Sequence, residues 1–142
     1  MCLAVNRENP LKGKYPLEFD EKGFFICWKV YLRFENLLYP FYQSSHGFVT
    51  NGWIVSDRES KELGKGYGDF YSNVNRMGVT CGIHVYTSKE SAEKDFGTAR
   101  RSTIVPVRCH RSQLIAVGDD TPQAAFMKVF LKKEDYDKAI KK

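Results

Sequence analysis

Residues 24–34, FFICWKVYLRF, alternate between two kinds of position along the chain. The even positions are all apolar, whereas the odd positions include Lys29 and Arg33. A period of two sends successive side chains to opposite faces of an extended strand. We therefore predict a β-strand over residues 24–34 whose even face is committed to the core.

Shorter apolar stretches predict further strands, bounded by glycine, proline and polar residues. They are GFVTNGWIV at 47–55, GIHVYT at 82–87, STIVPVRC at 102–109, QLIAVG at 113–118 and AAFMKVFL at 124–131. Pro106 lacks the N–H that a strand donates to its neighbour, which predicts an edge or bulged strand at 102–109.

Two helices are predicted from capping residues and helical spacing. The first follows Thr87, which can cap it with Glu90 three residues on, and the second covers the basic end KKEDYDKAIKK, with Tyr136 and Ile140 on one face. The connections are too short for regular crossover helices. The predicted fold class is therefore α+β: one domain over residues 1–142, built on a mainly antiparallel, curved sheet with two short helices.

The segment at 56–78, SDRESKELGKGYGDFYSNVNRMG, is polar and punctuated by glycines. It predicts a surface excursion of the kind that often carries function. Its aromatic residues Tyr67, Phe70 and Tyr71 are candidates for stacking on a base or anchoring a protein interface.

The net charge, the cysteines and the lengths of the apolar runs indicate which partners, cofactors and location to expect. A net charge of +5 over 142 residues favours an acidic partner, because long-range attraction raises the rate of encounter with opposite charge. The four cysteines lack the spacing of metal ligands, so we expect no metal and no cofactor. With no basic-then-apolar leader and no apolar run long enough to span a bilayer, we expect a cytoplasmic protein with reduced thiols.

The clearest candidate binding surface is the acid-free stretch ARRSTIVPVRCHRS at 99–112. It contains Arg100, Arg101, Arg108, His110 and Arg111. If the chain returns these side chains to one side, they form a patch that can hold phosphates or carboxylates through bidentate guanidinium contacts. The alternative is an ordinary solvated charge run.

A catalytic alternative starts from Cys2, directly behind Met1. Removal of the methionine gives an N-terminal cysteine whose amine can act as base for its own thiol. His84, at the junction of a predicted strand and helix, and Lys29 complete the candidate catalytic set. The structural alternative is a first strand with a buried thiol.

Two further alternatives concern nucleotides. In one, His84, Arg33 and backbone amides hold a phosphorylated ligand, so that the protein acts as a nucleotide sponge. In the other, the order of Arg33, the Tyr-Thr-Ser sequence at 86–88 and Gln123 resembles the three motifs of ADP-ribosyltransferases, with Gln123 where their glutamate stands. This order implies a degenerate relative of that fold.

The stretches MCL, CWKVY, LYPFY, GIHVYTSKESA and VPVRCHRSQLIAVGD together resemble a group of small phage and prophage proteins. In that resemblance Cys2, Lys29, Tyr42 and His84 occupy recurring positions. It implies an infected or lysogenic host cell as the setting, where small proteins commonly act by occupying a host surface.

The leading hypothesis is therefore a non-enzymatic binder that inhibits a host factor, of anti-CRISPR or other counter-defence type. Its expected partner is a host protein or protein–nucleic-acid complex, with an anionic ligand or nucleic acid as further options and no membrane. The sequence leans against an enzyme.

Overall fold

The computed structural model describes residues 3–6, 8–40, 48–56, 67–68, 76–79, 82–96 and 100–141, with the backbone alone at 67–68 and 76–79. Its strands are β1 (Leu3–Asn6), β2 (Phe24–Phe34), β3 (Leu37–Pro40), β4 (Gly52–Val55), β5 (Tyr67–Gly68), β6 (Arg76–Val79), β7 (Ile83–Tyr86), β8 (Ser102–His110), β9 (Leu114–Val117), β10 (Gln123–Phe126) and β11 (Lys128–Leu131). The helices are α1 (Lys89–Phe96) and α2 (Lys133–Ile140), and a single 3₁₀ turn covers Arg111–Gln113.

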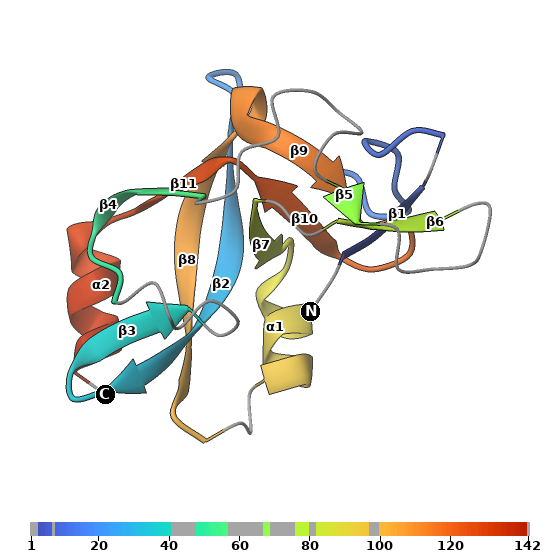
Figure 1. The fold of residues 1–142 in the computed structure, drawn as a ribbon. Helices are drawn as coiled ribbons and strands as arrows, with labels where there is room; N and C mark the ends of the chain where they lie inside the picture. Colours follow the sequence, from blue (N-terminus) through green and yellow to red (C-terminus); the bar gives the residue numbers. More distant parts are fainter. Residues whose placement is uncertain are drawn as a thin grey trace.

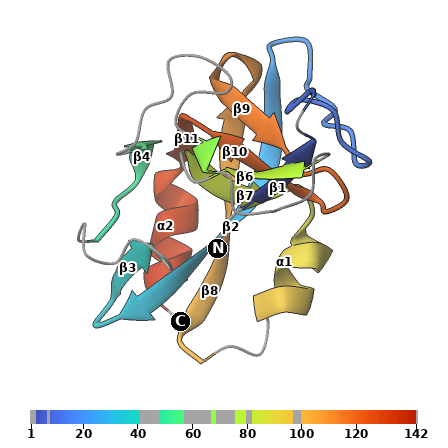
Figure 2. The ribbon, with the colours of Figure 1, turned by 45° about the vertical axis from the view of Figure 1, so that its right-hand side comes forward.

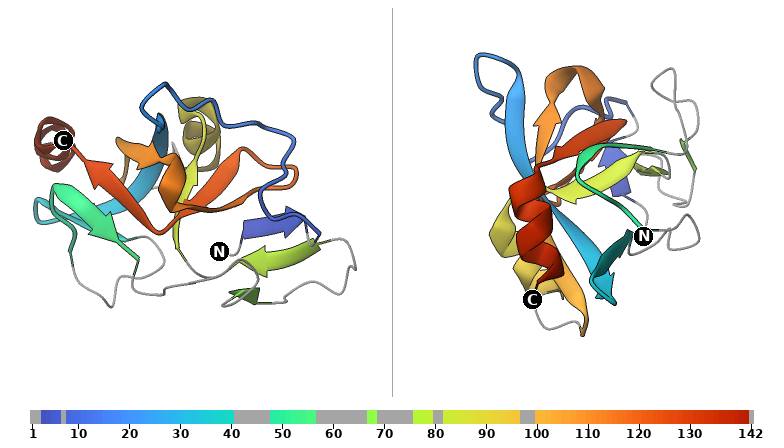
Figure 3. Two further views of the ribbon diagram at one scale, coloured as in Figure 1. Left: turned by 90° about the horizontal axis from the view of Figure 1, so that it is seen from above. Right: turned by 90° about the vertical axis from the view of Figure 1, so that its left-hand side faces the viewer.

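The strands of the described residues form two sheets, and every pairing is antiparallel (Figure 1). The larger sheet has the order β4-β11-β8-β2-β7-β10-β9, and β3 also pairs with β2. The smaller sheet, β1-β6-β5, lies at the end of the molecule far from α2 (Figures 1 and 3). This architecture confirms the predicted α+β class with a mainly antiparallel sheet and two helices.

β2 and β8 form the centre of the larger sheet through nine consecutive pairs, from Phe24↔His110 to Leu32↔Ser102. The odd face of β2 carries the main core, because Cys27 and Tyr31 are almost completely buried there. On the even face Val30 is buried, but Ile26 is 54% exposed. The prediction that the even face is fully committed to the core was therefore wrong.

The reason lies in how the two cations of the odd face are accommodated. Lys29 donates a hydrogen bond to the backbone carbonyl of His84, and Arg33 donates one to the carbonyl of Ile140. Carbonyl acceptors let long cationic side chains lie beside a core without leaving their donors unpaired.

The two helices stand on either side of the β2–β8 pair (Figure 2). α2 packs on the odd face through Ala139, Tyr136 and Ile140, which confirms the predicted contact face of the last helix. On the even face, α1 contributes Ala92 to a cluster with Val30.

Three local predictions differ from the structure. Helix α1 is capped by Ser88, whose Oγ accepts a hydrogen bond from the Ser91 amide at 3.2 Å, and not by Thr87. β8 is a central strand despite Pro106, because the odd residues of β8 bond to β2 (Arg33 N to Arg101 O, 2.7 Å) and the proline nitrogen therefore faces away from β2. Residues 124–131 form two strands that separate at Met127 and join different parts of the sheet.

The described residues contain no helix long and apolar enough to cross a membrane. Leu3 and Val5 of β1 are buried, as expected for a first strand, whereas Cys2 lies outside the described residues.

Two glycines with positive φ separate backbone strain from crowding. A Cβ at Gly82 (φ +84°) would lie 2.5 Å from Ile115 Cδ1, whereas a Cβ at Gly52 (φ +104°) would meet nothing within 4 Å. We expect Gly52→Ala to lower the free energy of unfolding by about 1–2 kcal/mol through strain alone. Gly82→Ala should cost at least about 1 kcal/mol more, because overpacking adds to the strain. Urea unfolding of both variants measures the difference, and equal losses would contradict the crowding at Gly82.

Candidate functional site

Lys29 lies at a fork in the larger sheet. One edge of β2 pairs with β7 at Trp28↔Tyr86 and with β3 from Tyr31↔Pro40 onward, so that Lys29 stands between the two partners. Its Nζ donates to the His84 carbonyl at 2.9 Å and lies 5.8 Å from the centroid of the Tyr31 ring. Burial lowers the pKa of Lys29 to about 8. The ammonium thus supplies a donor to β7 where its ladder with β2 ends.

The fork brings together two residues of the candidate catalytic set, but not their reactive groups. Lys29 contacts the backbone of His84, whereas the His84 side chain shares the face of Tyr86, opposite to that of Lys29. The third member, Cys2, lies outside the described residues. The contact between Lys29 and His84 is therefore structural.

The residues of the nucleotide alternatives are also separated. The guanidinium of Arg33 donates to the Ile140 carbonyl at 3.4 Å, at the C-terminal end of α2, where the helix dipole favours a cation. Tyr86 pairs with Gln123 and donates its hydroxyl hydrogen to Asp95 at 2.8 Å. Since Arg33 and Tyr86 lie on opposite faces of the sheet, the structure does not bring Arg33 together with either Tyr86 or His84.

The predicted arginine patch is divided between the two ends of β8. Arg100 and Arg101 precede the strand, whereas Arg108 and His110 lie near its end and Arg111 follows it. Arg108 lies seven positions after Arg101 along extended chain, a span of about 23 Å. The strand runs straight from one group to the other instead of returning them to one side. Phe70, Tyr71 and the side chain of Tyr67 lie outside the described residues.

His110 supports the chain around it. Its Nδ1 accepts from the Ser112 amide at 3.1 Å, so Nε2 carries the hydrogen and donates to the Lys22 carbonyl at 2.9 Å. Both ring nitrogens are thus occupied by the segments that precede β2 and follow β8.

A different cluster gathers on the even face of the larger sheet, and we call it the aromatic–cationic face. Its residues come from four neighbouring strands: Phe24 and Ile26 of β2, Arg108 of β8, Lys128 and Phe130 of β11, and Trp53 and Val55 of β4. The register pairs Trp53 with Phe130, Phe130 with Arg108, and Arg108 with Ile26. Directly paired residues share a face, so these four form one row across the sheet.

Rings and cations of this face contact one another. The Arg108 guanidinium lies 4.4 Å from the centroid of the Phe24 ring, and Lys128 Nζ lies 5.0 Å from that of Trp53. Trp53 and Phe130 meet edge to face at 5.2 Å. These contacts hold the cations beside aromatic rings, an arrangement that also suits a planar or anionic ligand.

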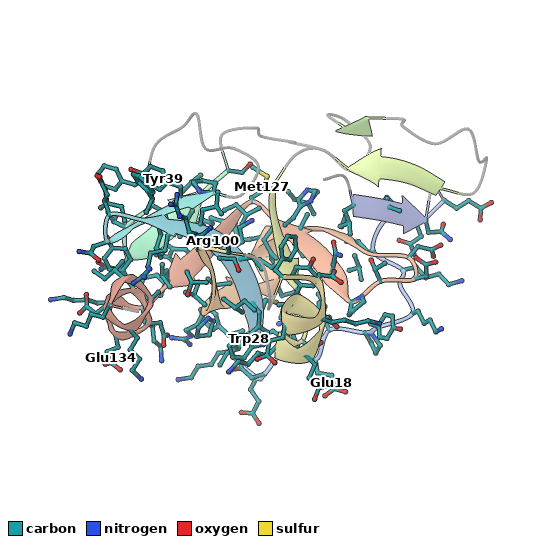
Figure 4. The ribbon with its side chains drawn as sticks, turned by 90° about the horizontal axis from the view of Figure 1, so that it is seen from below. Glu18, Trp28, Tyr39, Arg100, Met127 and Glu134 are labelled. Atoms are coloured by element: carbon teal, nitrogen blue, oxygen red, sulfur yellow. The ribbon has the colours of Figure 1, made fainter. Side chains whose placement is uncertain are left out.

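Three of the seven side chains of the face are exposed and the other four are half-buried. Trp53 is 50% exposed, Val55 60% and Ile26 54%. Helix α1 covers only the neighbouring part of the same face, where it lies beside Trp28 (Figure 4).

One carboxylate lies near the face. Asp20, in the turn before β2, accepts hydrogen bonds from the amides of Phe24 and Lys22, each at 2.9 Å. The hydrogen bond from Phe24 has the largest effect in lowering the pKa of Asp20, and the charge of Arg108 adds to it. Both amides bond to the same oxygen of Asp20, Oδ1, and the carboxylate attracts the Arg108 guanidinium through its charge.

The sequence contained a signal for this face that the prediction missed. KVFL at 128–131 and GWIV at 52–55 each alternate between side chains that face the core and side chains that do not. Only the strand order shows that the outward positions of these stretches meet those of β2 and β8.

A comparison of the sequence with models of known protein families gives no match, and neither does a comparison with characterised proteins or of the fold with solved structures.

The pKa of Lys29 predicts a specific dependence of stability on pH. Between its folded value of about 8 and its ordinary value of 10.5, the unfolded chain binds more protons at this site than the folded chain. The contribution of Lys29 to stability therefore rises with pH across this window, by at most about 1.4 kcal/mol per pH unit. Below pH 8 both states are charged and the slope vanishes.

The variant Lys29→Met lacks this group. We expect the wild-type free energy of unfolding, minus that of the variant, to grow as the pH rises from 7.5 to 9.5. Urea unfolding at four or five pH values measures that difference, in which the titration of cysteines and tyrosines cancels. A difference that is independent of pH would show that the ammonium is not desolvated at the fork.

Proposed function

We propose that this protein is a non-enzymatic binder that engages a negatively charged partner through its aromatic–cationic face. The observation that carries the proposal is the row Trp53–Phe130–Arg108–Ile26, which crosses four strands. Its two end residues are exposed and its two middle residues are half-buried, whereas the opposite face of the same strands packs on the main core. Exposed clusters of large apolar side chains mark interaction sites, and tryptophan and arginine are the residues most enriched in binding hot spots.

The electrostatics of the chain support an anionic partner. The net charge of the chain is +5. Each cation of the face stands beside an aromatic ring, Arg108 beside Phe24 and Lys128 beside Trp53. A cation held in place before binding loses less freedom when it meets an anion.

The reactive groups elsewhere in the described residues support binding over catalysis. Lys29, Arg33 and His110 each donate a hydrogen bond to a backbone carbonyl. In these positions they hold strands, a helix end and a turn together.

The resemblance to phage proteins supplies the biological part of the proposal. In that setting the partner is a factor of the host cell, and occupying its surface inhibits it, as in anti-CRISPR or other counter-defence action.

Charge reversal tests the location of the binding surface. Arg108→Glu with Lys128→Glu changes the aromatic–cationic face, and Arg100→Glu with Arg101→Glu changes the opposite end of β8 by the same amount, so both double variants fall from +5 to +1. On immobilised heparin, used as a generic polyanion, the first variant should elute at clearly lower salt than the second, because only the first loses cations from the contact surface.

Thermal unfolding of both variants controls for folding. Equal elution of the two folded variants would reduce the interaction to net charge. Earlier elution of the Arg100/Arg101 variant would move the surface to the other end of β8.

A further inference from the structure

The aromatic–cationic face carries an inference about the class of its partner, which rests on the proposed function. We propose that the face binds single-stranded nucleic acid, with a base stacking on Trp53 and phosphates contacting Arg108 and Lys128.

Rings and cations alternate on the face in a way that matches a single strand. Arg108 lies against Phe24 and Lys128 against Trp53, so each of these two rings has a cation within 4.4–5.0 Å of its centroid. A single strand presents the same alternation, because each nucleotide carries one flat base and one charged phosphate. Proteins that bind single strands combine a positive surface with aromatic side chains on which successive bases stack.

The shape and size of the face also favour a single strand. The row crosses three strand spacings, or about 14 Å, on an open antiparallel sheet. Open sheets of this kind stack two or three unpaired bases.

The rings of the face favour a single strand over a duplex. Bases in a duplex are stacked on one another, so their flat faces are closed to protein rings. A duplex would meet only the two cations, whereas an unpaired strand meets the rings as well. Trp53 lies on the edge strand β4 and is half exposed, which leaves its indole accessible to a base.

The experiment measures fluorescence anisotropy of fluorescein-labelled ten-nucleotide probes: oligo(U), oligo(dT) and a hairpin duplex of equal charge. We expect both single strands to bind and the duplex to bind at least tenfold more weakly. Two phosphate contacts on a single strand predict a slope of about −1.4 for the logarithm of the association constant against the logarithm of the salt concentration.

Substitutions at Trp53 separate stacking from charge. Trp53→Ala should weaken oligo(U) binding by about five- to hundredfold, since one base–aromatic stack is lost, whereas Trp53→Phe should largely restore it. Neither substitution changes the charge, and heparin has no bases to stack, so Trp53→Ala should cost much less affinity for heparin, through the lost support of Lys128, than for oligo(U). In a Trp28→Phe background, oligo(U) should also quench the fluorescence of Trp53.

The possible failures can be told apart. If single strands bind no better than the duplex, or if Trp53→Ala leaves oligo(U) binding unchanged, the nucleic-acid assignment is overturned, while the heparin result still decides the proposed function. Binding of poly-glutamate that depends on Trp53, without binding of oligonucleotides, would likewise overturn the assignment and identify an acidic protein as the partner class. If the Arg108/Lys128 variant also matches its control on heparin, both proposals fail.

Discussion

The nine-pair ladder between β2 and β8 is the constraint on which the rest of the structure depends. It decides which side chains of both strands face α2 and which face α1 and solvent. Because side chains alternate along a strand, a slip of one residue would exchange Cys27 and Tyr31 for Ile26 and Leu32 in the core. The long register therefore determines both the core and the composition of the open face.

Two cations of β2 lie on the core side of the ladder, and backbone carbonyls accept their hydrogen bonds. Lys29 and Arg33 occupy the core side of β2, and each reaches a backbone carbonyl at a place where regular structure ends: the end of a ladder for Lys29 and the end of a helix for Arg33. Carbonyl groups at such places need donors in any case. Placing a long cation there gives each carbonyl a donor and joins β7 and α2 to the central strand.

Sequence reasoning identified the fold class and most strands, because alternation and short connections are local signals. It chose the wrong face of β2, since the even face is the more apolar of the two and only the packing partners show which face is covered. The break at Met127 was missed for a similar reason: AAFMKVFL is continuously compatible with a strand, and only the tertiary pairing separates its halves.

The candidate site was harder to predict than the fold. Arg108 was identified from its local charge pattern, and the expected patch grouped it with its sequence neighbours Arg100 and Arg101. Its spatial neighbours Phe130 and Ile26 come from segments far away in the sequence. A surface built across four strands depends on strand order, which a single sequence does not contain.

The pair Cys27 and Cys109 gives the ladder a built-in reporter. Both thiols are fully buried on neighbouring strands, and the hydrogen bond with Cys109 together with burial raises the pKa of Cys27. Such thiols are inert towards alkylating reagents while the two strands remain joined. The rate at which these two cysteines become labelled therefore reports how often the central strands separate. This rate measures the kinetic stability of the ladder without an engineered probe.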